Sequence, residues 1–388
     1  MIYLDYNATT PLSAKARAAM LPYLDSVFGN PSSVHEAGRR ARAAIDDSRD
    51  RVASLLGVRP NEIIFTGGGT EADNLAVLGL ARGHAASGRH IISCRTEHHA
   101  VLNTVEQLER EGFSVTWVEV APDGLVDLDD LRRSLTPETI LVSIMAANNE
   151  TGVIQPLSEI SKICREHGVL LHSDMVQAFG KIPIDLSLVD AASFAAHKFH
   201  GPKGAGILYL RGGLPIQSIM FGGAHENQRR PGTENVAAIA GLAEAASEFG
   251  YDPREMERQE KLRDRLWTGI RQAWPSAILN GERAPRIANT LNVSFTGIDS
   301  QTLLIALDLE GICASSGSAC MVGSVVASHV LLAMGAPKEQ AAAAVRLSLG
   351  HETTEKEIET VIGIFEKLAR RWSERLGISQ GHALVAAT

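Results

Sequence analysis

Cysteine is scarce in this sequence of 388 residues, which contains only Cys94, Cys164, Cys313 and Cys320. Four cysteines in so long a chain do not form a disulfide framework. No two of them make a C-x-x-C pair, and no histidine pair has ligand spacing on one helix, so no metal site is expected. This low cysteine content is typical of a protein from a reducing compartment.

Positive charge is also in deficit. The chain has 37 Lys and Arg against 45 Asp and Glu, which gives a formal net charge of −8. A nucleic-acid partner requires a basic face that neutralises phosphates. The charge balance therefore argues against nucleic acid as a partner, and it says nothing about the fold.

Long apolar segments are missing as well. Residues 311–337 contain no Asp, Glu, Lys or Arg and have the length of a spanning helix, but serines, glycines and His329 are scattered through them. A bilayer would leave those polar groups without partners. The first residues, MIYLDYNATTP, have neither the basic flank nor the apolar run of a signal peptide. We therefore expect a soluble, cytoplasmic protein with no membrane partner.

What the sequence does have, from about residue 60 to residue 211, is an alternation of short apolar runs and helix-like segments. The runs are nearly continuous in Val, Ile, Leu and Ala, as in strands buried on both faces. The segments between them are long enough for crossover helices, so the pattern predicts an α/β domain with a mostly parallel sheet. The expected strands are EIIFTG (62–67), HIISC (90–94), VTWVEV (115–120), ILVSIMAA (140–147), VLLHSD (169–174), AASFAAH (191–197) and GAGILYL (204–210).

The pattern changes after residue 250. The segment DPREMERQEKLRDRLWTGIRQAW predicts a charged helix, with Asp252 as its cap and Pro253 in its first turn. Beyond it, NTLNVSFTG indicates a strand, SQTLLIALDLEGI a helix, and a final helix begins at about Thr354. We expect this part to form a smaller α+β domain.

Polar side chains follow the ends of five expected strands. Because ligands of open α/β sheets bind beyond the carboxyl ends of the strands, these segments outline one site. The segments are TGGGTEADN after the first strand, RTEHH after the second, NNETG after the fourth, Asp174 and Gln177 after the fifth, and His197 with Lys198 after the sixth.

The loop GGGTEADN has two interpretations. Glycine amides followed by a helix start at Thr70 form an anion cradle, which suits a single phosphate because no Gly-Lys-Ser/Thr follows as in a nucleotide loop. A glycine-rich turn capped by Thr70 explains the same residues without a ligand. The loop by itself does not decide between the two.

Lys198 and Asp174 point to one cofactor. A lysine after a buried strand is commonly a surface residue, but Lys198 follows a run of apolar and small residues, and desolvation would lower its pKa as Schiff-base chemistry requires. A carboxylate at a buried strand end, such as Asp174, needs a cationic partner. A phosphate cradle, such a lysine and such an aspartate are the three features that pyridoxal 5′-phosphate requires.

With these residues in view, the chain resembles the cysteine desulfurases of the NifS/IscS type, which are fold-type I pyridoxal-phosphate enzymes of the class-V aminotransferase group. The resemblance runs nearly from end to end. Its motifs are YLDYNATTP (3–11), FGNPSSVHEAG (28–38), FTGGGTEADNLA (65–76), TEHHAVL (96–102), VSIMAANNETG (142–152), HSDMVQAFGKIPID (172–185), SFAAHKFHGPKGAGILY (193–209), RRPGTENVA (229–237), ASSGSAC (314–320) and VRLSLG (345–350).

The resemblance implies a division of the chain and a set of roles. Residues 15–252 would form the large cofactor-binding α/β domain, and residues 1–14 with 253–388 the small α+β domain that carries the catalytic cysteine. The implied catalytic residues are Lys198 as the Schiff-base lysine, Cys320 as the nucleophile and His98, which stacks on the cofactor ring and moves protons. The implied cofactor ligands are Asp174 at the pyridine nitrogen, Gln177 at the phenolic oxygen, and Gly69, Thr70, His197 and Thr233 at the phosphate. Asn149 and Arg346 would hold the substrate carboxylate.

In the family, Thr233 reaches the phosphate of the neighbouring subunit, so a homodimer is implied. Cys320 lies in SSGSACMVG, where glycine and serine suit a loop that takes sulfur from L-cysteine and passes it to an iron–sulfur scaffold or another acceptor protein. One departure concerns the cofactor. The family often has a phosphate-bonding serine where this chain has Ala195, which removes one donor.

Three hypotheses follow. The first is a cysteine desulfurase that converts L-cysteine to L-alanine and feeds iron–sulfur cluster assembly or another sulfur-transfer pathway. The second is a selenocysteine lyase on the same scaffold. The third is a non-catalytic sulfur carrier or scaffold protein, against which the set of Lys198, Asp174, His98 and Cys320 argues.

Overall fold

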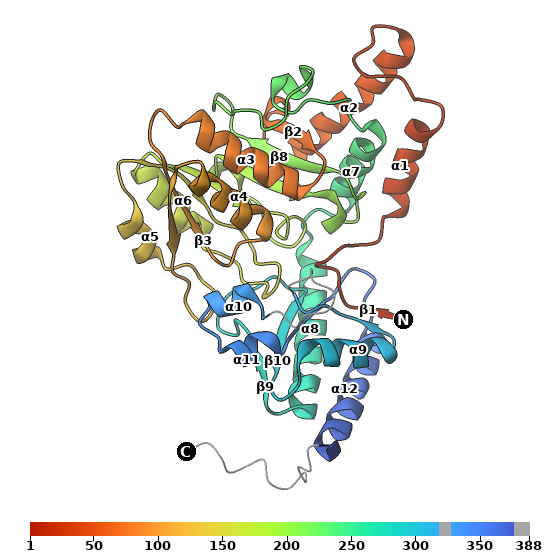
Figure 1. Ribbon diagram of the computed structural model, residues 1–388. Helices are drawn as coiled ribbons and strands as arrows, with labels where there is room; N and C mark the ends of the chain where they lie inside the picture. Colours follow the sequence, from red (N-terminus) through yellow and green to blue (C-terminus); the bar gives the residue numbers. More distant parts are fainter. Residues whose placement is uncertain (318–326, 376–388) are drawn as a thin grey trace.

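A computed structural model describes residues 1–317 and 327–375. Its larger part is built on a seven-stranded sheet, whose place in the molecule is seen in Figure 1. The strand order is β2-β8-β7-β6-β5-β3-β4. All neighbours pair in parallel except β8, which is antiparallel to both β2 and β7. The α/β fold with a mostly parallel sheet is therefore confirmed. The strands are β2 (Ile63–Thr66), β3 (His90–Cys94), β4 (Ser114–Val118), β5 (Thr139–Ser143), β6 (Leu170–Asp174), β7 (Ala191–Ala195) and β8 (Gly206–Leu210).

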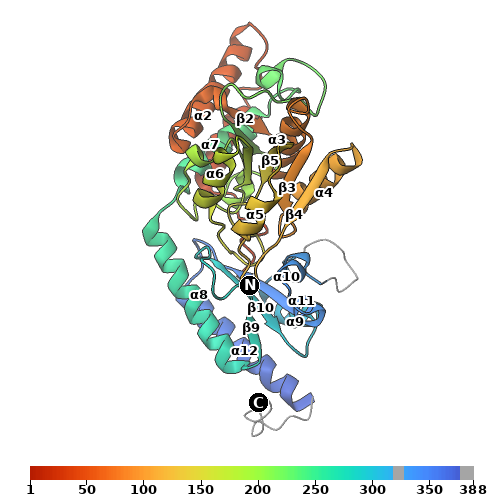
Figure 2. The same cartoon turned by 90° about the vertical axis from the view of Figure 1, so that its left-hand side faces the viewer.

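Side chains of consecutive strand residues pack into the cores on opposite faces of the sheet, because side chains alternate across a sheet. Ile63 packs with one layer of helices and Ile64 with the other. Figure 2 shows α3 and α4 on one side of the sheet and α2, α6 and α7 on the other. Both faces are covered, which explains the near-continuous apolar runs. The helices of this part are α1 (Ala14–Leu24), α2 (Glu36–Leu56), α3 (Gly69–Gly83), α4 (His99–Arg110), α5 (Leu128–Ser134), α6 (Leu157–Glu166) and α7 (Val236–Glu248).

The second part has its own core around Phe295, whose ring stacks on Phe365 at 5.5 Å and meets Trp274 edge-on at 5.3 Å. Its strands β9 (Ala277–Leu279), β10 (Thr290–Phe295) and β12 (Ala344–Ser348) form an antiparallel sheet, and β1 (Ile2–Tyr3) pairs in parallel with β11 (Ile312–Cys313). The long helices α8 (Pro253–Ala273) and α12 (Glu355–Arg375) run side by side along it (Figure 2). The remaining helices are α9 (Ser300–Leu309), α10 (His329–Ala333) and α11 (Lys338–Ala342).

The first thirteen residues connect the two parts. Leu4 is fully buried in the core around Phe295. A few residues later, the amide of Thr10 donates to the carbonyl of His197 over 2.9 Å, in the large part. The chain then enters α1, which packs on α7. Asp252 caps α8 by accepting from the amide of Arg254, as predicted. The exact division at residues 14/15 and 252/253 stays a prediction.

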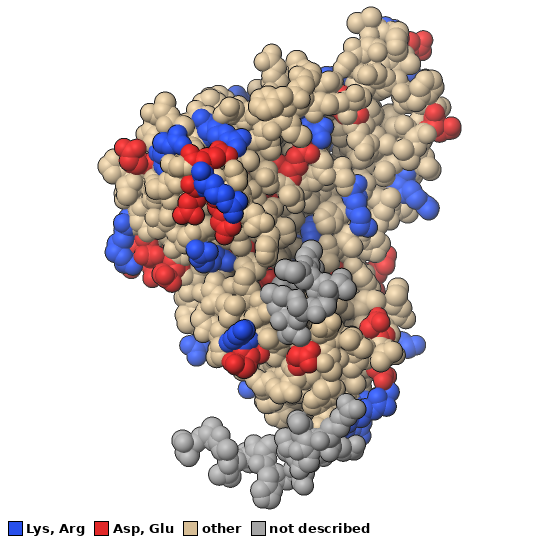
Figure 3. Space-filling view, viewed as in Figure 1, with Lys and Arg blue, Asp and Glu red and all other residues tan. Residues whose placement is uncertain are grey.

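Charge is mixed on the surface. On the face seen in Figure 3, acidic and basic side chains are interspersed. Several pairs join separate elements, among them Arg82 with Glu111 and Arg230 with Glu71. Within residues 1–317 and 327–375, no helix combines the length and the apolar character that crossing a bilayer demands.

Gly206 on β8 allows the glycine loop after β2 to approach closely. A Cβ at this position would lie 2.6 Å from the carbonyl carbon of Gly68 and 2.7 Å from the carbonyl oxygen of Phe194, and both atoms belong to the backbone. We predict that Gly206→Ala lowers the free energy of unfolding by about 1–3 kcal/mol, because backbone must move to make room. Urea denaturation measures this loss.

The matched control is Gly363→Ala on α12. Nothing lies within 4 Å of a Cβ there, so alanine is expected to stabilise the helix by about 0.5–1 kcal/mol. Equal unfolding midpoints for Gly206→Ala and the unmodified protein would contradict this account of the β8 contact.

Candidate active site

Lys198 lies at the end of the short 3₁₀ turn Ala196–Lys198 that follows β7. Its Nζ donates to the carbonyl oxygens of Asn7 (2.6 Å) and Ala8 (2.8 Å). Burial and the positive charge of Arg346 lower the pKa of Lys198 to about 8, while Asp174 and Asp5 act in the opposite direction. About a tenth of this amine is therefore neutral, and nucleophilic, at pH 7, far more than for a lysine with the ordinary pKa.

Asp174 ends β6 and is buried. Its Oδ1 accepts from the amide of Val176 over 2.8 Å. No cation of the described residues lies within ion-pair distance of it, and burial raises its pKa to about 6. A buried carboxylate with one backbone partner is suited to receive a cationic ligand atom.

Gln177 lies one turn further along, with both amide atoms engaged. Its Nε2 donates to the carbonyl of Asn7 over 2.9 Å, and its Oε1 accepts from Nζ of Lys181 over 2.5 Å. Asn7 thus accepts from Gln177 and Lys198 at once, and it ties the two residues together.

The two predicted histidines differ in their partners. Nδ1 of His98, the N-cap of α4, accepts from the amide of Ala100 over 3.1 Å. In the neutral ring the proton therefore lies on Nε2. Nδ1 of His197 lies 3.2 Å from Oγ1 of Thr9. Surrounding protein atoms and the charge of Lys198 lower the pKa of both rings, so both are neutral at pH 7.

The glycine loop leads into the N-terminus of α3, whose helix begins at Gly69 after Gly68 as its cap. Thr70 is therefore the second helical residue and does not cap the helix. A Cβ on Gly69 would lie 2.8 Å from Cγ2 of Val176 and 3.3 Å from Cβ of Ala195, so the loop rests against the ends of β6 and β7. The first amides of a helix have no acceptor within it, so the start of α3 offers N–H groups beside the ends of β6 and β7.

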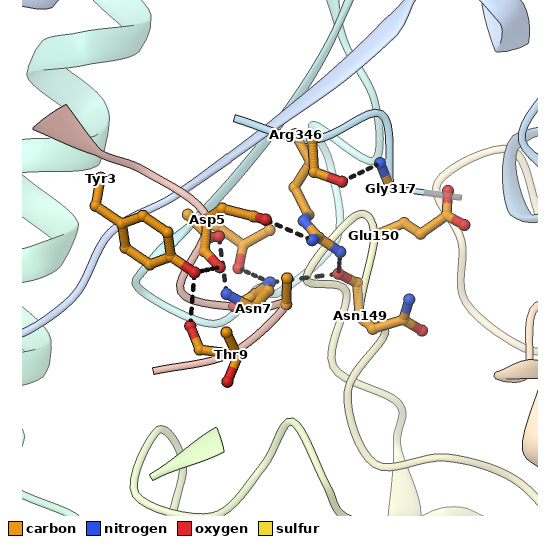
Figure 4. A network of polar contacts seen from close by, with 12 residues as sticks. Tyr3, Asp5, Asn7, Thr9, Asn149, Glu150, Gly317 and Arg346 are labelled. Atoms are coloured by element: carbon orange, nitrogen blue, oxygen red, sulfur yellow. Dashed lines mark hydrogen bonds and ion pairs between the residues drawn. The ribbon is translucent and has the colours of Figure 1, made fainter. Parts of the chain in front are cut away.

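Arg346 on β12 reaches the same place from the small part (Figure 4). Its Nη1 donates to the carbonyl of Asn149 over 2.9 Å, and its Nη2 to Oδ1 of Asp5 over 2.8 Å. Nε of Arg346 and Oδ1 of Asn149 are buried and have no partner among the described residues. These two atoms are available for a ligand with both donor and acceptor groups.

Two predicted residues lie apart from this group. Thr233 is exposed in the loop before α7, and it makes no hydrogen bond with the residues above in the part of the chain that the structure describes. Cys320 lies outside the described residues. The chain on either side of it is placed by Glu150, which accepts from Oγ of Ser328 over 2.5 Å and lies against Gly317.

Asn7 and Lys181 are among the site residues that sequence reasoning did not single out. Both lie inside quoted motifs, YLDYNATTP and HSDMVQAFGKIPID, but neither residue type signals a role by itself. Oδ1 of Asn7 accepts from Lys181 and from Asn289, and its Nδ2 donates to Thr290. The signal that the sequence offered was the place of both residues inside those motifs.

These residues fit pyridoxal phosphate. Asp174 offers a buried carboxylate for a protonated ring nitrogen, the start of α3 offers amides for a phosphate, and Lys198 offers an amine of lowered pKa. Ala195 contributes only a methyl group at the cradle. Its contribution to phosphate binding is therefore limited to packing.

Comparisons with known proteins agree with this reading. The family model "Aminotransferase class-V" matches residues 2–361. The chain is 43% identical to "Cysteine desulfurase IscS" of Dictyoglomus turgidum over 373 residues, 95% of each chain. It is 44% identical to the protein of that name from Methanosarcina thermophila, over 95% of this chain and 92% of the relative.

Solved structures are similar as well. A "NIFS-LIKE PROTEIN" superposes with a TM-score of 0.88 at 38% identity, over 95% of this chain and 99% of the other. A structure described as "SspA in complex with cysteine" superposes with a TM-score of 0.80 at 33% identity, over 90% and 99%. The chain belongs to the class-V aminotransferase family of pyridoxal-phosphate-dependent, fold-type I enzymes. Within it, the chain is a member of the cysteine desulfurases, so the first of the three hypotheses is confirmed.

The lowered pKa of Lys198 can be measured on the cofactor-free protein. Only the neutral amine attacks an aldehyde, so the rate of pyridoxal-phosphate capture is expected to rise with pH through a midpoint of about 8. Stopped-flow absorbance from pH 6 to 11 gives this profile. A midpoint near the ordinary lysine value of 10.5 would show that burial and Arg346 do not perturb the amine.

Proposed function

We propose that this enzyme carries out its desulfurase reaction with Lys198 as the lysine that bonds the cofactor and Cys320 as the sulfur acceptor. The observation that carries the proposal is the position of Lys198. Its amine is enclosed beside the Asp5–Arg346 pair and within electrostatic reach of Asp174. Pyridoxal phosphate, when bound, supplies an electron sink that weakens bonds at the substrate's α- and β-carbons.

The chain's own residues then have distinct tasks. Asp174 would keep the ring nitrogen protonated, because a carboxylate in this buried position stabilises a cation next to it. Gly69, Thr70 and His197 would hold the phosphate, and Gln177 would donate to the ring's phenolic oxygen. The amine of Lys198 would hold the cofactor and would also be placed to move a proton at the substrate's α-carbon.

His98 is proposed to lie over the cofactor ring. Since its Nδ1 is engaged by the amide of Ala100, its Nε2 is a proton donor in the neutral state. The imidazole of His98 is therefore better suited to donate a proton to a developing negative charge than to remove the thiol proton of Cys320 at the start of the reaction. The substrate amine is the remaining acceptor for that thiol proton.

Arg346 and Asn149 are proposed to bind the carboxylate of L-cysteine. An arginine presents two parallel N–H groups to a carboxylate, which favours this geometry over a single charge. In the structure as it stands, Asp5 and the carbonyl of Asn149 occupy Nη2 and Nη1 of Arg346. Substrate therefore either joins this network through Nε or exchanges with Asp5.

The sulfur-transfer step balances without a further reagent. The thiolate of Cys320 attacks the substrate sulfur, an S–S bond forms, and the substrate's C–S bond breaks. The β-carbon takes the electron pair and then a proton, which gives L-alanine. The persulfide on Cys320 is proposed to pass its outer sulfur to an iron–sulfur scaffold or another acceptor protein in the cytoplasm.

A homodimer is proposed from the upper end of the large part (Figure 1). Phe28 and Val34 in the α1–α2 connection are 81% and 89% exposed, and Phe221 is 90% exposed. Ser32 Oγ lies 3.3 Å from Nε2 of His225, which joins the two loops. Apolar side chains this exposed favour an interface, and the exposed Thr233 would reach a neighbour's phosphate from the same region.

The experiment that tests the proposal uses Cys320→Ala. This variant is expected to bind cofactor and L-cysteine normally, because those contacts involve other residues, and to lose alanine release by at least about 100-fold since no nucleophile remains. The unmodified enzyme, given L-cysteine without reductant, should carry one added sulfur on the peptide that contains Cys320. Mass spectrometry and an alanine assay measure both effects.

Cys94 and Cys164 serve as internal controls in the same digest. Both thiols are buried, and burial raises the pKa of Cys164 to about 12, so neither should gain sulfur. Persulfide found mainly on another cysteine, or normal alanine release by Cys320→Ala, would overturn the proposal.

A further inference from the structure

Lys181 is a second amine next to the cofactor site, and the roles described so far do not use it. It follows Gln177 by four residues in a run of helical turns, where the amide of Lys181 donates to the carbonyl of Ala178. Positions four apart on such a turn lie on the same face. Lys181 is partly buried, and no carboxylate of the described residues lies within 4.0 Å of its Nζ.

Its two polar contacts are both with amide oxygens. Nζ lies 2.5 Å from Oε1 of Gln177 and 3.2 Å from Oδ1 of Asn7. Lys181 and Lys198 also line one cavity of about 30 Å³, which is large enough for a water molecule. The amine thus belongs to the same polar network as the cofactor-bonding lysine.

Two amides face the amine of Lys181, and their other partners show which end of each is the oxygen. An amide side chain can be turned end for end, and its partners decide which end is which. The main-chain carbonyl of Asn7 only accepts, so the end of Gln177 next to it has to be the NH₂ group. The oxygen end then accepts from Lys181. Burial and the charges of Lys198 and Arg346 hold the pKa of Lys181 well below its ordinary value, and a neutral amine donates to this oxygen as an ammonium would.

The same reasoning applies to Asn7. With Oδ1 toward Lys181 and Asn289, its Nδ2 faces Oγ1 of Thr290. One N–H of Gln177 is used by Asn7, and the second has no acceptor among the described residues. An N–H without a protein acceptor is available to a ligand oxygen.

We propose that Lys181 is a positioning residue of the cofactor site, which fixes the amides of Gln177 and Asn7 so that Gln177 presents an N–H to the ring oxygen of pyridoxal phosphate. The inference rests on the proposed role of Gln177. A reversed amide would place a carbonyl oxygen against the ring oxygen and repel it. Lys181 therefore acts through Gln177 and does not touch the cofactor itself.

The test is a double-mutant cycle on binding of 4′-deoxypyridoxine phosphate, measured with the cofactor-free protein. This probe has the ring oxygen and the phosphate but no aldehyde, so it reports the non-covalent contacts without the bond to Lys198. Lys181→Met is expected to weaken its Kd about fivefold, the effect of losing one well-placed hydrogen bond. In a Gln177→Ala background the same substitution should change Kd less than about twofold.

Two further variants keep the test decisive. Lys203→Met removes an exposed lysine of the following turn and should leave Kd unchanged. Lys181→Gln retains a donor for Oε1 of Gln177 and should bind the probe with a Kd within about twofold of that of the unmodified protein. This variant still tests the inference if Lys181→Met does not fold. Equal effects of Lys181→Met in both backgrounds, or no effect in either, would overturn the inference. Absence of probe binding by the unmodified protein would instead overturn the cofactor site itself.

Discussion

The carbonyl oxygens of Asn7 and Ala8 hold the amine of Lys198, and the arrangement of the site follows from this contact. The two carbonyls are available because residues 5–13 run as an irregular segment between the two cores. In a regular sheet they would be engaged by a neighbouring strand. The segment follows directly on Leu4, which is anchored in the small core, so the position of the amine depends on both parts of the molecule.

Charge in the site is arranged around partners that the protein does not supply. Asp174 is a buried carboxylate without a cation, and Lys181 is an amine without a carboxylate. Arg346 has a carboxylate in Asp5 but leaves Nε unpaired. Leaving such groups incompletely paired costs stability. A protonated ring nitrogen of the cofactor would complement Asp174, and a substrate carboxylate would complement Arg346, which explains why the cost of these two groups is tolerated.

Much of the fold was accessible from the sequence, because strands buried on both faces and capped amphipathic helices leave clear patterns. The strand ends also indicated that Asp174, Gln177 and Lys198 lie close together. Sequence could not show that Asn7 joins Gln177 to Lys198, because this contact depends on where an irregular segment crosses the sheet edge. It also placed the start of a helix at Thr70, whereas α3 begins one residue earlier, at Gly69, with Gly68 as its cap at a φ of +149° that glycine permits.

The central claim is that Lys198, and not the nearby Lys181, bonds the cofactor. Borohydride reduction of the loaded enzyme makes that bond permanent, and digestion followed by mass spectrometry locates the modified lysine. The account predicts that the added mass of the reduced cofactor is found on the peptide with Lys198, and that Lys181 and Lys203 are unmodified. Modification at Lys181, or reduction that leaves every lysine unmodified, would contradict it.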